Sequence, residues 1–315
     1  MSQFSDLPID LQRLATRQLG LFTSAQAQSL GVSRDRLSRF THLGILKRVT
    51  YTVYDSDPSP LLGRSPDLRR RRSAFVGLLA YGPDAIAVGT SALILHGVAG
   101  VPLGSPPQIA HPHASHHRTR DHINARMFDN EMVVVTVDGW RCASTQWALS
   151  QAVPELDRLS AVACMDSALN QRLISPGELV EAHQYARGRR GVLKTHRWWF
   201  EANGRSESPL ETAARLECCD HSIPPDALQH EAVDTAGIRR RLDLAWFLPD
   251  GSTLAAEIDG REFHDGLAAA YTDRVRQNSL IAGGDLTILR FTHRDLLTPG
   301  QVASTVLNTI STHRP

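Results

Sequence analysis

Three of the four carboxylates between residues 239 and 260 lie within two runs of apolar residues. Asp243 lies in one run of alternating apolar residues, and Glu257 and Asp259 lie in a second such run. The residues between the runs, Pro249 to Gly251, are typical of a hairpin turn. If the hairpin is symmetric about residue 250, Asp243 lies opposite Glu257, and the strand period of two places Asp259 on the face of Glu257.

The other face of this hairpin is expected to be apolar. Its residues would be Leu242, Leu244, Trp246, Leu254, Ala256 and Ile258. Carboxylates that lie close together raise one another's pKa unless a cation compensates. Mg²⁺ or Mn²⁺ prefers oxygen ligands and can activate water for phosphodiester cleavage, so a divalent metal ion is a natural compensator for these carboxylates. The alternative is an exposed acidic face paired by Arg239 to Arg241, which needs no chemistry.

The residues around this hairpin match a recurrent pattern. The matching residues are Ser208-Pro209-Leu210-Glu211, Arg241-Leu242-Asp243, Glu257-Ile258-Asp259-Gly260, His264, Asp273, Arg276, Leu280 and Leu289-Arg290-Phe291-Thr292. Over residues 206–297 the chain closely resembles the DUF559 family, which is related to very-short-patch-repair endonucleases. The resemblance implies a PD-(D/E)XK-type core, a restriction-endonuclease-like α/β domain with a mixed sheet.

The same resemblance implies roles for individual residues. Asp243 and Glu257 would bind the metal, and Glu211 would lie nearby as a further acidic residue. His264 would act as a general base or position the attacking water. Asp259 stands where the general nuclease pattern has a lysine, so the usual cationic group is missing from that position.

Two arginines downstream allow two interpretations. Arg276 and Arg290 fit either the stabilisation of a transition state or plain salt bridges to Asp273 and Glu257. The salt bridge is the slightly preferred interpretation, because such pairs are common and need no chemistry.

The elements that would bring DNA to such a site are predicted at the N-terminal end. Residues 23–26 have the S/T-x-x-Q pattern that begins a helix, expected from about Ser24 to Leu30. Gly31 supplies a break, and Ser33 can cap a second helix from Arg34 to about Leu43. These features predict a helix-turn-helix.

The second helix has an apolar stripe for docking and a polar face for the DNA major groove. Leu37 and Phe40 form the stripe, and Leu43 continues it. The run from Ile45 to Tyr54 is rich in β-branched and aromatic residues, which predicts a two-stranded wing. The candidate DNA-contacting residues are Ser33, Arg34, Arg36, Ser38, Arg39, Lys47 and Arg48. The alternative is that the arginines only solvate a helix face.

This segment has the pattern Phe22-Thr23, Gln26-Ala27, Gly31-Val32-Ser33, Leu37, Gly44-Ile45-Leu46, Arg48-Val49 and Val53-Tyr54. It resembles the N-terminal winged-helix domain of AbiEi-type antitoxins, the autorepressing half of type IV toxin–antitoxin systems. The resemblance implies an operator as the DNA target and a cognate toxin as a possible partner.

Charge and composition predict three domains in an α+β chain. Net charge is +1 over 315 residues, but the first 54 residues hold seven Lys or Arg against three Asp, which gives +4. A second positive run, Arg69 to Arg72, follows a linker-like segment at Asp57 to Pro60. The predicted domains are a winged helix-turn-helix at 1–60, a central α+β antitoxin-like region at 64–200, and the endonuclease-like domain at 206–315.

The central region is expected to contain both helices and strands. Helices are predicted over residues 71–81, 91–96, 143–153, 156–170 and 177–185, and strands over 85–88, 108–110 and 132–137. The histidines between 111 and 122 could bind a metal, but a solvated loop is preferred because no recognised ligand spacing is present. Those histidines are His111, His113, His116, His117 and His122.

Compartment and partners follow from what the sequence contains. The opening residues lack the pattern of a secretory signal and no apolar run is long enough to span a membrane, so a cytoplasmic location and no membrane partner are expected. The cysteines form no C-x-x-C pair, which predicts reduced structural thiols. The expected partner is double-stranded DNA, and the oligomeric state stays open.

Three functions are compatible with these patterns. The first is an antitoxin-like, DNA-binding transcriptional regulator that carries an endonuclease-like domain. The second is an active Mg²⁺-dependent DNA endonuclease, favoured by the presence of Glu211, Asp243 and Glu257. The third is a protein-interaction module, since winged helices also bind proteins. Salt-dependent DNA affinity would separate the third from the other two.

Overall fold

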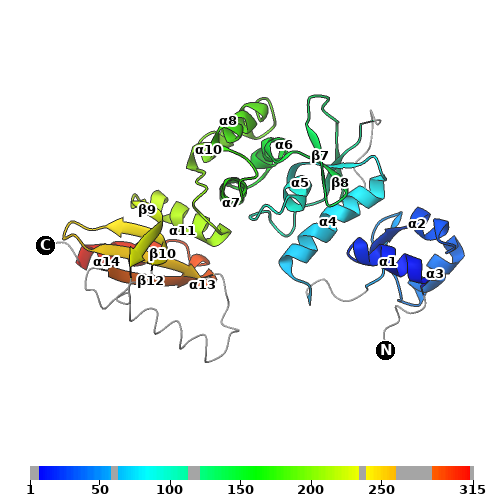
Figure 1. The fold of residues 1–315 in the computed structure, drawn as a ribbon, viewed down its shortest axis with the longest axis horizontal. Coiled ribbons are helices and arrows are strands. Elements are labelled where there is room, and N and C mark those ends of the chain that lie inside the picture. Colours follow the sequence, from blue (N-terminus) through cyan, green and yellow to red (C-terminus); the bar gives the residue numbers. More distant parts are fainter. Residues whose placement is uncertain (1–6, 58–62, 113–120, 234–238, 260–285, 313–315) are drawn as a thin grey trace. The chain divides into compact units, whose positions relative to one another are not determined.

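The computed structural model describes residues 7–57, 63–112, 121–233, 239–259 and 286–312. The chain is a mixed α+β protein of more than one unit, as predicted (Figure 1). One compact unit comprises residues 1–156 and 173–196, and the other comprises residues 157–172 and 197–315. Within the described ranges no helix is both long enough and apolar enough to cross a membrane. The predicted domain boundaries stay predictions.

The first unit begins with three helices and a small sheet. The strand order is β1-β3-β2, with antiparallel pairing throughout. Leu11, Phe22, Leu37 and Leu46 are fully or almost fully buried in the core between these elements. The elements are α1 (Ile9–Arg17), β1 (Leu21–Thr23), α2 (Ser24–Ser29), α3 (Arg34–His42), β2 (Lys47–Arg48) and β3 (Val53–Asp55).

The start of α2 is held by the predicted capping box. The Thr23 hydroxyl accepts from the backbone N–H of Gln26 at 3.1 Å, and the Gln26 side chain accepts from the backbone N–H of Thr23 at 2.8 Å. Two of the free N–H groups that open a helix are satisfied in this way. Gly31 then turns the chain with a φ of +81°, a conformation that glycine adopts without strain.

The rest of the first unit contains a five-stranded mixed sheet and its covering helices. The strand order is β6-β5-β4-β8-β7, with β4–β8 and β5–β6 parallel. The elements are α4 (Pro66–Tyr81), β4 (Ile86–Ala87), α5 (Gly89–Leu95), β5 (Gln108–Ala110), β6 (Asn124–Arg126), β7 (Val134–Val137), β8 (Trp140–Ala143), α6 (Thr145–Ala152), η3 (Val153–Glu155), α8 (Pro176–Tyr185) and α9 (Val192–Thr195).

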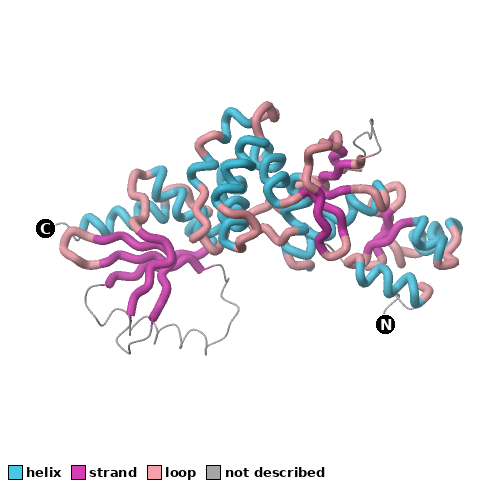
Figure 2. Tube along the Cα trace, turned by 45° about the horizontal axis from the view of Figure 1, so that its top comes forward, coloured by secondary structure: helices cyan, strands magenta, loops and turns pink. Residues whose placement is uncertain are grey.

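The second unit is built on a four-stranded mixed sheet with the order β12-β11-β10-β9 (Figure 2). β11 and β12 are parallel, and the other pairs are antiparallel. Helices α11 and α14 pack their buried residues against one face of this sheet. The elements are α7 (Arg158–Asn170), α10 (Trp198–Glu201), α11 (Pro209–Asp220), β9 (Ala227–Val233), β10 (Arg239–Phe247), β11 (Thr253–Asp259), β12 (Leu286–Thr292), α13 (His293–Leu296) and α14 (Gln301–Thr312).

A buried ion pair joins α7 to α11 in the second unit. The Asp166 carboxylate accepts from the Arg215 guanidinium at 2.7 Å, from the Thr212 hydroxyl at 2.8 Å and from the backbone N–H of Asn203 at 2.6 Å. Arg215 also donates to the Glu201 carbonyl at 2.8 Å. Because both charges are buried but well paired, this network fixes the helix that carries Glu211.

Candidate functional site

Helix α3 presents a basic face to solvent. The Ser33 hydroxyl caps the helix by accepting from the backbone N–H of Arg36 at 3.2 Å. Leu37 and Phe40 are buried on the inner side, which leaves the outer side to exposed polar residues. Those residues are Arg34, Asp35, Arg36, Ser38, Arg39 and His42. The structure therefore exposes every predicted contact residue on this helix.

The end of α3 differs from the prediction. Leu43 was expected to continue the buried stripe, but it is 55% exposed. Leu43 is the C-cap residue, and its backbone N–H still donates to the Arg39 carbonyl at 3.0 Å, so its side chain lies at the open end of the helix. An open hollow of about 600 Å³ lies beside it, lined by Arg36, Arg39 and Phe40 among others. Arg36 covers the Phe40 ring at 5.2 Å from its centroid.

The strands after α3 form a short hairpin with two cationic side chains, Lys47 and Arg48, which differ in their contacts. Lys47 and Arg48 are both exposed in β2. The Arg48 guanidinium donates to the carbonyls of Thr50 at 3.2 Å and Tyr51 at 2.6 Å, and lies over the Tyr51 ring. Arg48 therefore holds the turn, while the Lys47 side chain is better placed for a phosphate.

The basic run on α4, Arg69 to Arg72, contacts carboxylates of the same unit. Arg70 pairs with Asp67 at 3.0 Å and Arg71 pairs with Asp138 at 2.7 Å. Arg72 is buried and pairs with Asp55 at the end of β3. Three of the four arginines in this run therefore neutralise carboxylates of their own unit.

Two carboxylates meet in the second unit through a glutamine. Gln229 Nε2 on β9 donates to Glu211 Oε2 at 2.9 Å and to Asp243 Oδ1 at 3.2 Å. The other oxygen of Asp243 accepts from the backbone N–H of Ile258 at 2.8 Å. Glu211 and Asp243 were predicted to lie near one another, and the structure brings them together. The bridging glutamine was not foreseen.

The strand geometry changes at this point. The sequence predicts that side chains alternate regularly between the two faces of β10. In the β9–β10 ladder Leu242 pairs with His230 and Leu244 pairs with Leu228, but Asp243 between them is not paired. Gln229 has a φ of +53°, which is uncommon for a residue with a side chain. As a result Leu242 packs with Ala255 and Ile288, not with Leu244, which corrects the predicted single apolar face.

Burial controls the ionisation of this pair. It raises the pKa of the Asp243 carboxyl, and the charges of Glu207 and Asp259 raise it further, although the hydrogen bonds from Ile258 and Gln229 oppose them. Burial likewise raises the pKa of Glu211, with a further contribution from the charge of Asp243. The two carboxyls therefore hold protons more readily than free acids do.

Glu257 has a separate partner. Its carboxylate lies 3.2 Å from the Arg290 guanidinium, in the parallel register that places Glu257 beside Arg290. This is the salt bridge that the sequence favoured. Asp259 is exposed at the end of β11.

Both predicted metal ligands, Asp243 and Glu257, are described by the structure, but the predicted general base His264 is not. Among the described residues, no group of three or more His, Cys, Asp or Glu side chains could hold a metal ion. His264 lies outside the described residues, as do His113, His116 and His117 of the histidine segment. Mg²⁺ or Mn²⁺ at Asp243 and Glu257 stays a prediction, and no reaction step is derived through it.

Comparison with known proteins finds two similar chains. Both are uncharacterized proteins of Mycobacterium tuberculosis, one from strain CDC 1551 and one from strain ATCC 25618 / H37Rv. Each is 29% identical over 252 residues, which is 78% of this chain and 85% of the relative. No family model matches the chain. The similarity thus extends over most of both proteins.

Proposed function

We propose that this chain is a DNA-binding, antitoxin-like transcriptional regulator whose first 57 residues act as a winged helix-turn-helix. The supporting observation is α3, which buries Leu37 and Phe40 and exposes Arg34 and Arg39 on its outer side. The helix follows a tight turn after α2 and precedes a hairpin in a β1-β3-β2 sheet. This is the arrangement in which a second helix enters the major groove.

The exposed cations supply the attraction to DNA. Arg34, Arg36 and Arg39 can donate paired hydrogen bonds to guanine edges or to phosphates, because a guanidinium presents a planar fork of donors. Lys47 in β2 would contact the phosphate backbone as a point charge. The expected target is an operator, its own or that of a cognate toxin.

The test is the salt dependence of binding to a duplex. Fluorescence anisotropy with labelled DNA from the region upstream of the gene should give an affinity that falls linearly on a double-logarithmic plot against salt. A random duplex of equal length should bind more weakly. An affinity that does not change with salt would contradict the proposal and favour a protein-interaction module.

A second candidate function is a metal-dependent endonuclease. The observation in its favour is the approach of Glu211 and Asp243 through Gln229, on the helix and strand that the nuclease resemblance implies. Within this chain, Ile258 and Gln229 orient the Asp243 carboxylate. A bound Mg²⁺ or Mn²⁺ would supply activation of water.

The endonuclease is tested by plasmid cleavage. Supercoiled and linear DNA are incubated with Mg²⁺ or Mn²⁺, beside Asp243→Ala and Glu257→Ala variants and an EDTA blank. Nicking that requires metal and disappears in both variants would establish a nuclease. Duplex binding without nicking would leave the regulator as the only supported function.

A further inference from the structure

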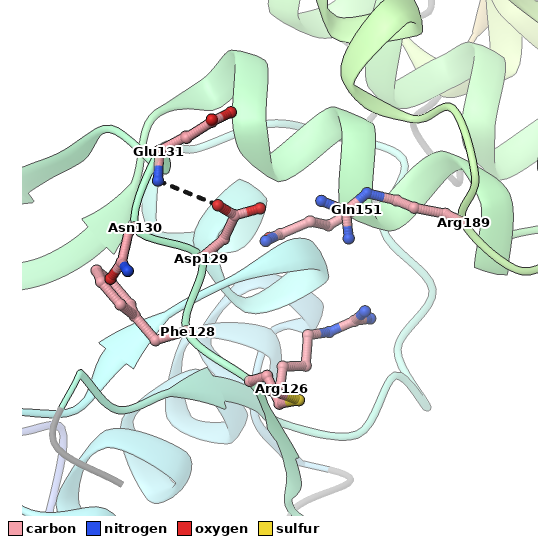
Figure 3. A pocket seen from close by; sticks show the side chains of 8 residues that line it. Arg126, Phe128, Asp129, Asn130, Glu131, Gln151 and Arg189 are labelled. Atoms are coloured by element: carbon pink, nitrogen blue, oxygen red, sulfur yellow. Dashed lines mark hydrogen bonds between the residues drawn. The ribbon is translucent and has the colours of Figure 1, made fainter. Parts of the chain in front are cut away.

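A polar cavity in the first unit is separate from both candidate sites. It has a volume of about 680 Å³ and lies between residues 126–131 on one side and Gln151 and Arg189 on the other (Figure 3). This volume is in the range of sites for small molecules. All the lining residues belong to one unit.

Two guanidiniums reach into this cavity from different elements. Arg126 comes from the end of β6, and Arg189 comes from the segment between α8 and α9 (Figure 3). Arg126 Nη2 pairs with Glu155 at 2.5 Å, but its buried Nε has no hydrogen-bond partner among the described residues. Arg189 Nε donates to the Tyr185 carbonyl at 3.3 Å, and the described residues offer it no carboxylate within ion-pair distance.

The pKa of Arg189 also indicates that negative charge near the two guanidiniums is insufficient. Burial lowers the pKa of Arg189, and the charge of Arg126 lowers it further, although Asp129 and Glu155 oppose this. A buried donor without a partner is costly unless a ligand or water satisfies it. Among the described residues, Arg126 thus has a carboxylate partner but a buried Nε without one, and Arg189 has a backbone acceptor but no ion pair.

The acidic residues of the cavity limit the kind of ligand. The Glu131 carboxylate points away from the guanidiniums, whereas Asp129 faces the space between them (Figure 3). Asp129 Oδ1 accepts from the backbone N–H of Glu131 at 3.0 Å, which fixes its direction. A ligand would meet cations on one side and an acceptor on the other, so it must carry an anionic group and a hydrogen-bond donor.

We propose that this cavity binds a small phosphate monoester with hydroxyl donors, such as a nucleoside monophosphate. Its phosphate would lie between Arg126 and Arg189, and its hydroxyls would donate to Asp129. A carboxylate has only two oxygens, which one guanidinium fork satisfies, whereas a phosphate has oxygens enough for two forks. Phe128 also lines the cavity, but its ring is directed away from the two guanidiniums (Figure 3).

The test is calorimetric titration of the full chain with adenosine monophosphate and with inorganic phosphate. Arg189→Gln should weaken binding of the nucleotide roughly tenfold or more, as expected for the loss of charge-assisted hydrogen bonds. Arg189→Lys should restore part of it. Arg190→Gln is the matched control, because Arg190 is exposed and does not line the cavity.

The outcomes separate a free phosphate compound from DNA phosphates. Nucleotide binding that Arg189→Gln weakens, with duplex affinity unchanged, would support the proposal. Equal losses in Arg189→Gln and Arg190→Gln, or no nucleotide binding at millimolar concentration, would overturn it. So would a loss of duplex affinity in Arg189→Gln without nucleotide binding. Because these readouts do not depend on α3, a failed DNA-binding test would leave them intact.

Discussion

The α3 face and the Glu211–Asp243 pair use charged residues in opposite ways. On α3 the arginines stand in solvent around a buried stripe of Leu37 and Phe40. In the second unit Glu211 is buried and Asp243 is half-buried, and each accepts hydrogen bonds from neighbours. Exposed charges cost little to fold and remain available to a polyanion, whereas buried charges must be paired or they destabilise the fold.

This difference in burial predicts whether a mutation changes DNA binding or the stability of the fold. Changes on α3 should alter binding and leave stability nearly unchanged. Changes around the buried carboxylates should alter stability first. Four measurements follow, in order of decreasing effect.

The largest effect is expected at the buried ion pair that supports α11. Asp166→Ala removes the acceptor of Arg215 and leaves a buried cation without its counter-charge. We expect the free energy of unfolding of the second unit to fall by about 3–5 kcal/mol. Urea denaturation followed by tryptophan fluorescence measures it.

The matched control is Asp220→Asn. Asp220 pairs with Arg158 at 2.7 Å, but its side chain is 53% exposed. An exposed pair contributes roughly 0–1 kcal/mol. If both variants lost the same stability, the contrast between buried and exposed charge in this unit would be wrong.

On the basic face, Arg39→Gln should weaken duplex binding roughly tenfold and reduce the salt slope by about 1. The melting temperature should not change, because Arg39 is exposed. Arg70→Gln on α4 serves as control, since Arg70 is already paired with Asp67. Equal loss of DNA affinity in the two variants would mean that α3 is not the recognition helix.

A smaller effect is expected at Asp243, and it depends on pH. The folded state raises the pKa of Asp243, so the native carboxyl binds protons more tightly than the unfolded chain does. Stability from this group is therefore present at acid pH and is lost as pH rises through its folded pKa. The stability of Asp243→Asn relative to wild type should therefore rise as the pH is raised from acid to 8, because only the wild type must ionise a carboxyl whose pKa burial raises.

The comparison of wild type and variant across pH reports on Asp243 together with Glu211, because the charge of Asp243 also raises the pKa of Glu211. Asp166 has a raised pKa as well, but Asp243 is not among its causes, so its contribution cancels. A variant less stable than wild type at pH 8 would show that the hydrogen bonds to Asp243 outweigh its desolvation.

The smallest effect concerns the helix cap at Ser33. Ser33→Ala removes the acceptor for the Arg36 N–H and should cost about 1 kcal/mol. Ser33→Asn retains a capping oxygen and should restore most of the loss. Hydrogen exchange of the first turn of α3 reports it locally. Unchanged exchange in Ser33→Ala would show that the cap does not limit the helix end.

Local signals predicted much of the fold. The hairpin centred on residue 250 has the expected register from Phe247 opposite Thr253 to Leu244 opposite Ala256. The pairing ends there, so the predicted placement of Asp243 directly opposite Glu257 is not part of the ladder. The caps Thr23 and Ser33 could be predicted from the sequence, because capping depends on residues within one helical turn. The strand at 108–110 was predicted to the residue.

One prediction failed at a local signal, and the other omissions depend on contacts distant in sequence. Helix α4 begins at Pro66, five residues before its predicted start. Ser65 caps its first turn, and the arginines that follow had been interpreted only as a positive run and not as part of the helix. The partners of Arg72 and Arg215 lie 17 and 49 residues away, and no periodicity carries such information. Gln229 escaped notice because it is informative only once Glu211 and Asp243 are known to flank it.

The buried pair between α7 and α11 also constrains how the chain can be made and divided. During synthesis Asp166 leaves the ribosome well before Arg215. The Asp166 carboxylate on α7 therefore has no counter-charge until Arg215 has been made. A fragment that begins at residue 206 would contain Arg215 without Asp166. Expression of the C-terminal part should therefore start before Asp157, the first residue of the second unit.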